Sequence, residues 1–147
     1  MPYSSFPNQP IGTQALEDAI SLAACVSIAG KDSIPQATRV HNLLRFERVS
    51  CLQAFGVANR EARNTAKNKD TSKLKSSLGK WLVEHDPEAY AKENYYAAAQ
   101  ALETGAEFQN TNVPPGLKYR PWTIDGLVEA IAIGDTVGTF FDGDWSG

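Results

Sequence analysis

Apolar residues recur every three or four positions between residues 36 and 55, and this spacing constrains the fold more than any other feature of the chain. An α-helix turns once in about 3.6 residues, so such residues share one helical face. The segment therefore predicts a long amphipathic helix. The residues that follow the spacing are Val40, Leu43, Leu44, Val49, Leu52 and Phe55.

Four further segments carry helical signals. Residues 14–29 place Leu16, Ala19, Ile20, Ala23 and Val26 on one face, residues 74–85 suit a short helix, and residues 123–133 suit another. Residues 86–104 begin at Asp86-Pro87-Glu88 and end before Gly105, which is a typical helix start and stop. Residues 64–73 are polar and predict an exposed loop.

These patterns predict an all-α protein of four to five helices with a proline- and glycine-rich C-terminal tail. No segment shows the alternating pattern of a strand. We expect one helical domain over residues 1–147, because this length supports a single core. Residues 1–12 and 134–147 are expected to be irregular.

Charge and composition exclude several classes of partner. The net charge is -3, which argues against nucleic acid because phosphate binding needs a basic face. No apolar run approaches the roughly 20 residues of a membrane helix, and no secretory signal is recognisable. Cys25 and Cys51 lie far apart in helical segments and predict reduced thiols. These features together favour a cytoplasmic protein.

Several catalytic motifs are missing from the sequence. The only histidines, His41 and His85, have no second histidine or cysteine at ligand spacing, so no metal site is predicted. No glycine-rich nucleotide-binding loop and no nucleophile elbow occurs.

Three groups of residues remain as candidates for chemistry. The first is Gly12 and Thr13, where free backbone N–H groups at a helix start could bind an anion or a polarised carbonyl. The alternative is an ordinary helix start with Thr13 as its cap.

The other two groups lie on the helices predicted over residues 36–55 and 86–104. In the first of these, Arg45 and Arg48 could bind a substrate carboxylate or phenolate next to His41. In the second, tyrosine and glutamate could transfer protons on an aromatic substrate. We therefore predict a site between the two helices. Its catalytic residues would be His41, Tyr90 and Glu93, and its substrate-binding residues Arg45, Arg48 and Tyr95.

The alternative for both groups is structural. Charged clusters on a helix are usually a solvated face with local ion pairs. Tyrosines at such spacings usually bury the ring and leave the hydroxyl at a wet edge.

Segments along the whole chain resemble class A FAD-dependent monooxygenases of the salicylate-hydroxylase-like kind. Residues 1–23 are similar to the region after that family's second FAD-binding motif, with Ala15–Ala19 matching its helix. "IPQATRVHNLLRFERVSCLQAF" resembles the family's next helix, and Arg45 and Arg48 fall on its arginines. "KWLVEHDPEAYAKEN" is similar to a Trp-rich segment of the family, and "RPW" also has counterparts there.

The resemblance implies a C-terminal helical portion that lacks the FAD-binding sheet. Gly12 and Thr13 match positions that face the flavin in the family, but Gln9, Pro10 and Ile11 replace its Gly-Gln-Gly run. We therefore expect no cofactor in the isolated chain, although the parent family uses FAD. The chain would be a stand-alone remnant or a split subunit acting on an aromatic or polyketide-like molecule in secondary metabolism.

Two other functions remain open from the sequence. One is a cofactor-free isomerase, cyclase or dehydratase of a natural-product pathway, and the other is a non-catalytic dimerisation module. The expected partners are an aromatic small molecule and either a second copy or a companion flavin-binding chain. A homodimer is expected because helices that pack against a sheet in the family would keep uncovered apolar faces here.

Overall fold

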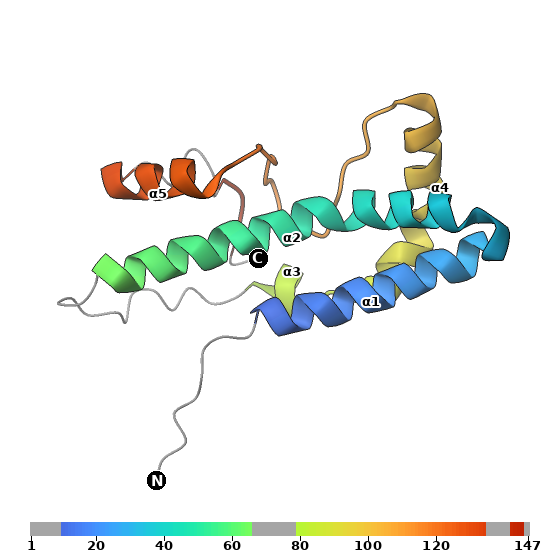
Figure 1. Cartoon of the computed structure of the whole chain (residues 1–147), viewed down its shortest axis with the longest axis horizontal. Coiled ribbons are helices and arrows are strands. Elements are labelled where there is room, and N and C mark those ends of the chain that lie inside the picture. The colour runs from blue at the N-terminus through green and yellow to red at the C-terminus, as the bar shows by residue number, and fades with distance from the viewer. Residues whose placement is uncertain (1–9, 66–78, 135–141, 146–147) are drawn as a thin grey trace, which may run out of the picture. The chain divides into compact units, whose positions relative to one another are not determined.

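The computed structural model of the chain describes residues 10–65, 79–134 and 142–145. These residues contain five α-helices, one 3-10 turn (Lys31–Ser33) and no strand (Figure 1). The prediction of an all-α fold is confirmed. The helices are α1 (Pro10–Ala29), α2 (Ile34–Thr65), α3 (Lys80–Val83), α4 (Pro87–Thr104) and α5 (Ile124–Ile133).

The chain divides into two compact units. Unit 1 comprises residues 1–45 and 86–108, and unit 2 comprises residues 46–85 and 109–147. The first part of α2 therefore belongs to unit 1 and the remainder to unit 2. Each unit is described by itself, and the expectation of a single domain over residues 1–147 stays a prediction.

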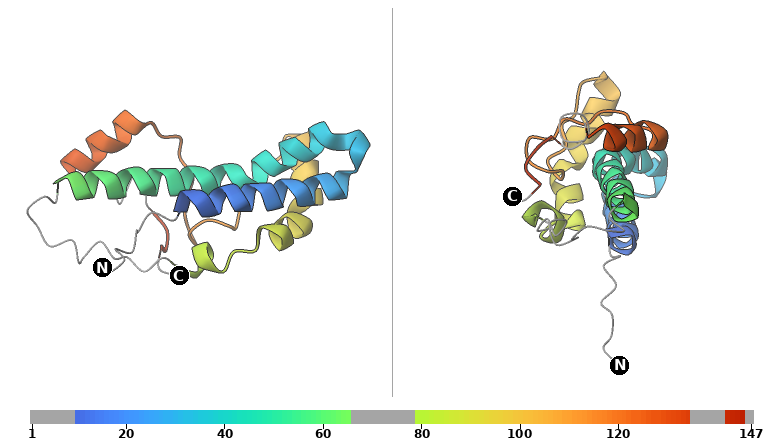
Figure 2. Two further views of the ribbon diagram at one scale, coloured as in Figure 1. Left: turned by 60° about the horizontal axis from the view of Figure 1, so that its bottom comes forward. Right: turned by 90° about the vertical axis from the view of Figure 1, so that its left-hand side faces the viewer.

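Unit 1 is built from α1, the first part of α2, and α4. Figure 2 shows α1 running beside the first part of α2. Small side chains dominate the core, which lets the helix backbones approach closely, since interhelical distance depends on the side chains at the contact. The buried core residues are Ala24, Cys25, Ala37, Val40, Leu44, Ala91, Tyr95, Ala98 and Ala99.

Local capping signals set the ends of α4 and α5. The Asp86 carboxylate accepts hydrogen bonds from the backbone N–H groups of Glu88 and Ala89, both at 3.0 Å. Gly105 ends α4 in the left-handed conformation, with φ 72°. Thr123 caps α5 by accepting from the N–H of Gly126. Both helices therefore lie where the sequence predicts them.

Three boundaries differ from the expectation. Helix α1 begins at Pro10, so Gly12 and Thr13 lie in its first turn instead of in a turn before it. Proline suits this position because the first helical N–H groups have no partner within the helix. Helix α2 continues to Thr65, and α3 is a single turn. Residues 66–78, which include most of the predicted loop and the start of the predicted short helix, lie outside the described residues.

Aromatic side chains organise unit 2. The Trp145 ring stacks on Phe55 with centroids 5.3 Å apart and meets Trp81 edge-on at 5.6 Å. The Trp122 indole N–H donates to the Ser50 hydroxyl at 2.8 Å. In the described ranges, no helix is both long and apolar enough to cross a membrane.

Candidate functional site

Arg45 is the centre of a polar contact between α1 and α2. Its guanidinium donates to Asp18 and Glu17, each at 2.7 Å, and to the Gln14 side-chain oxygen at 2.8 Å. The Arg45 side chain is buried, and that of Glu17 nearly so. Such charge-assisted hydrogen bonds offset the cost of burying the cation. The residue predicted to bind substrate therefore links two helices of its own chain.

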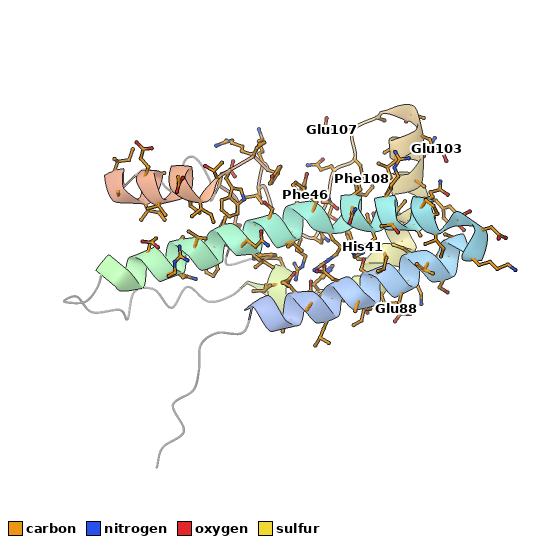
Figure 3. The ribbon with its side chains drawn as sticks, in the orientation of Figure 1. His41, Phe46, Glu88, Glu103, Glu107 and Phe108 are labelled. Atoms are coloured by element: carbon orange, nitrogen blue, oxygen red, sulfur yellow. The ribbon has the colours of Figure 1, made fainter. Side chains whose placement is uncertain are left out.

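His41 lies one helical turn before Arg45 and also faces α1, as Figure 3 shows. Its Nδ1 is 3.2 Å from the Ser21 hydroxyl. Burial lowers the pKa of His41 below its ordinary value of 6.5, while Asp18 raises it and Arg45 lowers it by smaller amounts. A neutral imidazole in this position can accept a proton. Its catalytic role stays a prediction.

The residues on α4 occupy three different environments. Tyr95 is 3% exposed and lies in the core of unit 1, where its hydroxyl has no hydrogen-bond partner among the described residues. Burial raises the pKa of that phenol. Tyr90 packs against the edge of the same core, and Glu93 is exposed.

The predicted site residues make two kinds of contact. His41 and Arg45 contact side chains of α1, whereas Tyr90 and Tyr95 pack with the apolar core. In unit 1, α2 contributes Val40 and Leu44 to that core, and α4 contributes Tyr95 together with three alanines. The roles of His41, Arg45, Tyr90, Glu93 and Tyr95 in binding and catalysis stay predictions.

Arg48 holds together three parts of unit 2. It donates to the backbone oxygens of Asn112 at 2.9 Å, Trp81 at 3.0 Å and Leu82 at 3.2 Å. Its guanidinium carbon lies 5.3 Å from the centre of the Trp81 ring, within the range of a cation–π contact. The fully buried Arg48 thus links α2 to α3 and to the connector before α5.

A small hollow lies in unit 2 between α2 and residues 117–122. It measures about 20 Å³ and is lined by Cys51, Ala54 and the segment from Leu117 to Trp122. This volume holds about one water molecule, whereas sites for small molecules measure roughly 300–1,000 Å³. Burial raises the pKa of the Cys51 thiol to about 12, so it is a poor nucleophile at neutral pH.

The other cysteine is also buried and inert. Burial raises the pKa of Cys25 to about 11, and the Ser21 side chain lowers it by a smaller amount. Neither cysteine forms a disulfide, as predicted. Among the described residues, no group of three or more His, Cys, Asp or Glu side chains could hold a metal ion.

The described residues do not fit FAD by themselves. Dinucleotides are bound by a glycine-rich turn between a strand and a helix, and the described ranges contain no strand. Gly12 has open space around the position of a missing Cβ, which would permit close approach of a ring. One exposed glycine in the first turn of α1 supplies only a small part of such a site. The predicted contacts of Gly12 and Thr13 with flavin stay predictions.

Comparison with known proteins reveals clear relatives. FAD-dependent monooxygenase mdpD of Emericella nidulans is 44% identical over 140 residues, which are 92% of this chain and 27% of that protein. A FAD-dependent monooxygenase of Claviceps purpurea is 42% identical over 92% of this chain and 28% of its own length. This chain is homologous to a C-terminal portion of FAD-dependent monooxygenases.

The homology is confined to a part of each monooxygenase. The chain spans between a quarter and a third of the relatives it matches, including nsrK of Aspergillus novofumigatus, which is 39% identical over 98% of this chain and 32% of that protein. No family model matches the chain, and no solved structure matches it. The family predicted from the sequence is nevertheless confirmed.

The polar partners that α1 supplies to α2 were not among the residues predicted from the sequence. Gln14 and Ser21 each lie three or four residues from Glu17 and Asp18, so the four residues share a helical face. This polar spacing was the available signal. It indicates a face that can contact Arg45 and His41, whereas the prediction for this helix was based on its apolar spacing.

Proposed function

We propose that the chain is the C-terminal helical part of a FAD-dependent monooxygenase that acts on an aromatic or polyketide-like small molecule in fungal secondary metabolism. The observation that carries this proposal is 39–44% identity to several such monooxygenases over more than nine tenths of the chain. The chain operates either as a part of a longer polypeptide or as a split subunit beside a flavin-binding chain.

The internal contacts support a structural contribution to that enzyme. Arg45 joins α1 to α2, and Arg48 joins α2 to α3 and the connector before α5. Both cations are buried and hydrogen-bonded within their own unit. Hydrogen bonds to a buried cation fix the positions of the helices that supply the acceptors. Flavin binding is then the role of the portion of the enzyme that this chain does not span.

A chimeric enzyme tests the proposal. In mdpD of Emericella nidulans, this chain would replace the portion that it matches. We expect the purified chimera to retain flavin at near one equivalent, measured by visible absorbance, and to convert the substrate of mdpD or a close analogue. The matched control is mdpD from which the same portion is deleted, and it should lose flavin or activity. A chimera that is helical by circular dichroism but retains no flavin would contradict the proposal.

A further inference from the structure

The last described residues of the chain cross unit 2 as a short strap. Residues 142–145 belong to no helix, and Figure 2 shows them beside α3. At the end of this segment, the Trp145 ring contacts two other rings, Phe55 of α2 and Trp81 of α3. We call the space that the Trp145 ring fills the aromatic slot, and we call residues 142–145 the strap.

The contacts of Trp145 define the kind of molecule that the aromatic slot accepts. The Trp145 ring stacks on Phe55 with the two ring planes 21° apart, which suits two flat aromatic groups. Trp81 meets the same ring edge-on, and the Trp81 indole N–H donates to the backbone oxygen of Trp145 at 3.3 Å. Each of these groups is neutral. The slot therefore fits a flat, uncharged compound of fused aromatic rings that carries a carbonyl oxygen.

The walls of the aromatic slot are held by contacts that do not involve the strap. Phe55 lies on α2, which is a helix of 32 residues. Arg48 is fully buried on the same helix, and it donates to the backbone oxygens of Trp81 and Leu82. Its guanidinium also lies over the Trp81 ring. These contacts fix α3 on α2, so both walls stay in place when the Trp145 ring leaves.

The strap is held mostly at the surface. The Asp142 carboxylate accepts hydrogen bonds from the Lys118 backbone N–H and from Arg120, each at 3.3 Å, and the pair with Arg120 is exposed. Exposed ion pairs contribute little to stability, because water screens both charges. The Asp144 N–H donates to the Pro115 oxygen at 2.7 Å. One such bond also contributes modestly, because water offers equivalent partners to a detached strap.

The rings of Phe55, Trp81 and Trp145 are all half-buried, so the aromatic slot is reached from solvent once the strap detaches. Segments with few buried contacts open locally without unfolding the rest of a protein. We propose that the aromatic slot is a binding site for a flat, uncharged aromatic ketone, and that the strap fills it in the absence of this ligand. The inference does not depend on the proposed function, because every residue that it uses belongs to unit 2 of this chain.

Fluorine NMR of the 147-residue chain labelled with 5-fluorotryptophan tests whether the strap gives way to a ligand. The sequence contains three tryptophans, and single Trp→Phe variants assign their signals. The probe is 2-acetylnaphthalene, which has two fused rings and a carbonyl oxygen. We expect the probe to shift the signals of Trp81 and Trp145, the latter toward the position of a solvent-exposed indole. Trp122 is the internal control, because its N–H donates to Ser50, and its signal should move at least fivefold less.

A matched ligand and two variants supply a second measurement, the dissociation constant. 2-Ethylnaphthalene has the same rings but no carbonyl oxygen, and it should bind about tenfold more weakly because the Trp81 N–H would lack an acceptor. Trp145→Ala removes the competing ring and should bind 2-acetylnaphthalene at least tenfold more tightly than the parent chain. Trp81→Phe keeps an aromatic wall without the N–H, so it should bind the two compounds equally.

The outcomes decide the proposal in the parent chain and in the variants. A Trp145 signal that stays in place up to the solubility limit of 2-acetylnaphthalene would overturn it, whether or not the variants fold. Equal affinity of the parent chain for the two naphthalenes would overturn the ketone as ligand. A Trp81→Phe variant that is helical by circular dichroism and still prefers the ketone tenfold would place the binding site elsewhere. None of these results bears on whether the mdpD chimera retains flavin.

Discussion

Two buried arginines show what can and cannot be recognised from single residues. Arg45 and Arg48 were predicted to bind substrate, because cations close to apolar positions are rare in this chain. In the structure they bind groups that lie 27 to 64 residues away along the sequence. Helical spacing specifies a face of α2, but it contains no information about which distant helix meets that face.

Replacement of Arg45 tests the contact between α1 and α2. Arg45→Ala leaves Glu17 and Asp18 without their cation, and we expect the free energy of unfolding to fall by about 3 kcal/mol. Lys92→Ala provides the matched control, because it removes an exposed ion pair with Glu88 and should change stability by less than about 0.5 kcal/mol. Urea unfolding followed by circular dichroism measures both. Equal effects of the two variants would contradict the structural role of Arg45.

His41 should make the stability of the chain depend on pH. Burial lowers its pKa in the folded chain below the ordinary value of 6.5, so the unfolded chain binds more protons as pH falls below this value. Stability therefore decreases as pH falls through 6.5 and continues to decrease until the lower, folded-state pKa is reached.

The variant His41→Asn isolates this contribution, since it keeps a polar side chain and cannot titrate. Melting temperatures measured between pH 7 and pH 5 should fall less steeply for His41→Asn than for the parent chain. The other histidine, His85, is unchanged in both proteins and serves as an internal control. Parallel curves for the two proteins would show that His41 does not titrate as inferred.

At the scale of elements, the ends of a helix could be predicted from the sequence where local capping residues set them. Asp86, Gly105 and Thr123 act on backbone groups within three or four residues, and the helices that they bound were predicted correctly. The start of α1 was predicted four residues too late, because Thr13 is a good capping residue and Pro10 is an equally good first-turn residue. The sequence alone does not show which of these two neighbouring helix-start signals the chain uses, because contacts with the rest of the fold decide between them.

The Asp86 cap can be tested directly. Asp86→Ala removes the acceptor for the N–H groups of Glu88 and Ala89, and we expect a loss of about 1 kcal/mol in the free energy of unfolding. Asp86→Asn retains an acceptor oxygen and should lose no more than a few tenths of that amount. Thermal or urea unfolding of the three proteins provides the comparison. A full loss in Asp86→Asn would mean that charge, not capping, stabilises this end of α4.

At the scale of the whole molecule, the sequence predicted the family and the helical class correctly. It also predicted an apolar face on α1, but not that Leu16 and Ile20 of this face are exposed. Gln14 and Ser21 of the same helix are buried. The burial of the face that carries Gln14 and Ser21 depends on Arg45, because a buried cation needs carboxylates nearby.

The isolated chain should be colourless after purification. Its described residues offer Gly12 and Thr13 but no strand–turn–helix unit for a dinucleotide. Purified protein incubated with excess FAD and then desalted should retain less than about a tenth of an equivalent, measured by visible absorbance. The parent mdpD chimera, treated in the same way, is the positive control. A stoichiometric flavin spectrum from the isolated chain would contradict this prediction.

The homodimer predicted from the sequence is also open to measurement. The isolated chain has a mass of 16.0 kDa and leaves Leu16 and Ile20 of α1 exposed. A short aliphatic strip associates when concentration rises, but it is much smaller than the roughly 1,200 Å² that a stable, specific interface buries, and it supports only weak pairing. Light scattering should therefore give the monomer mass at low micromolar concentration and a rising average mass toward several hundred micromolar. The double variant Leu16→Asp/Ile20→Asp should remain monomeric throughout, because two carboxylates on each copy would be brought together and desolvated. If the variant associates as strongly as the parent chain, self-association uses another surface.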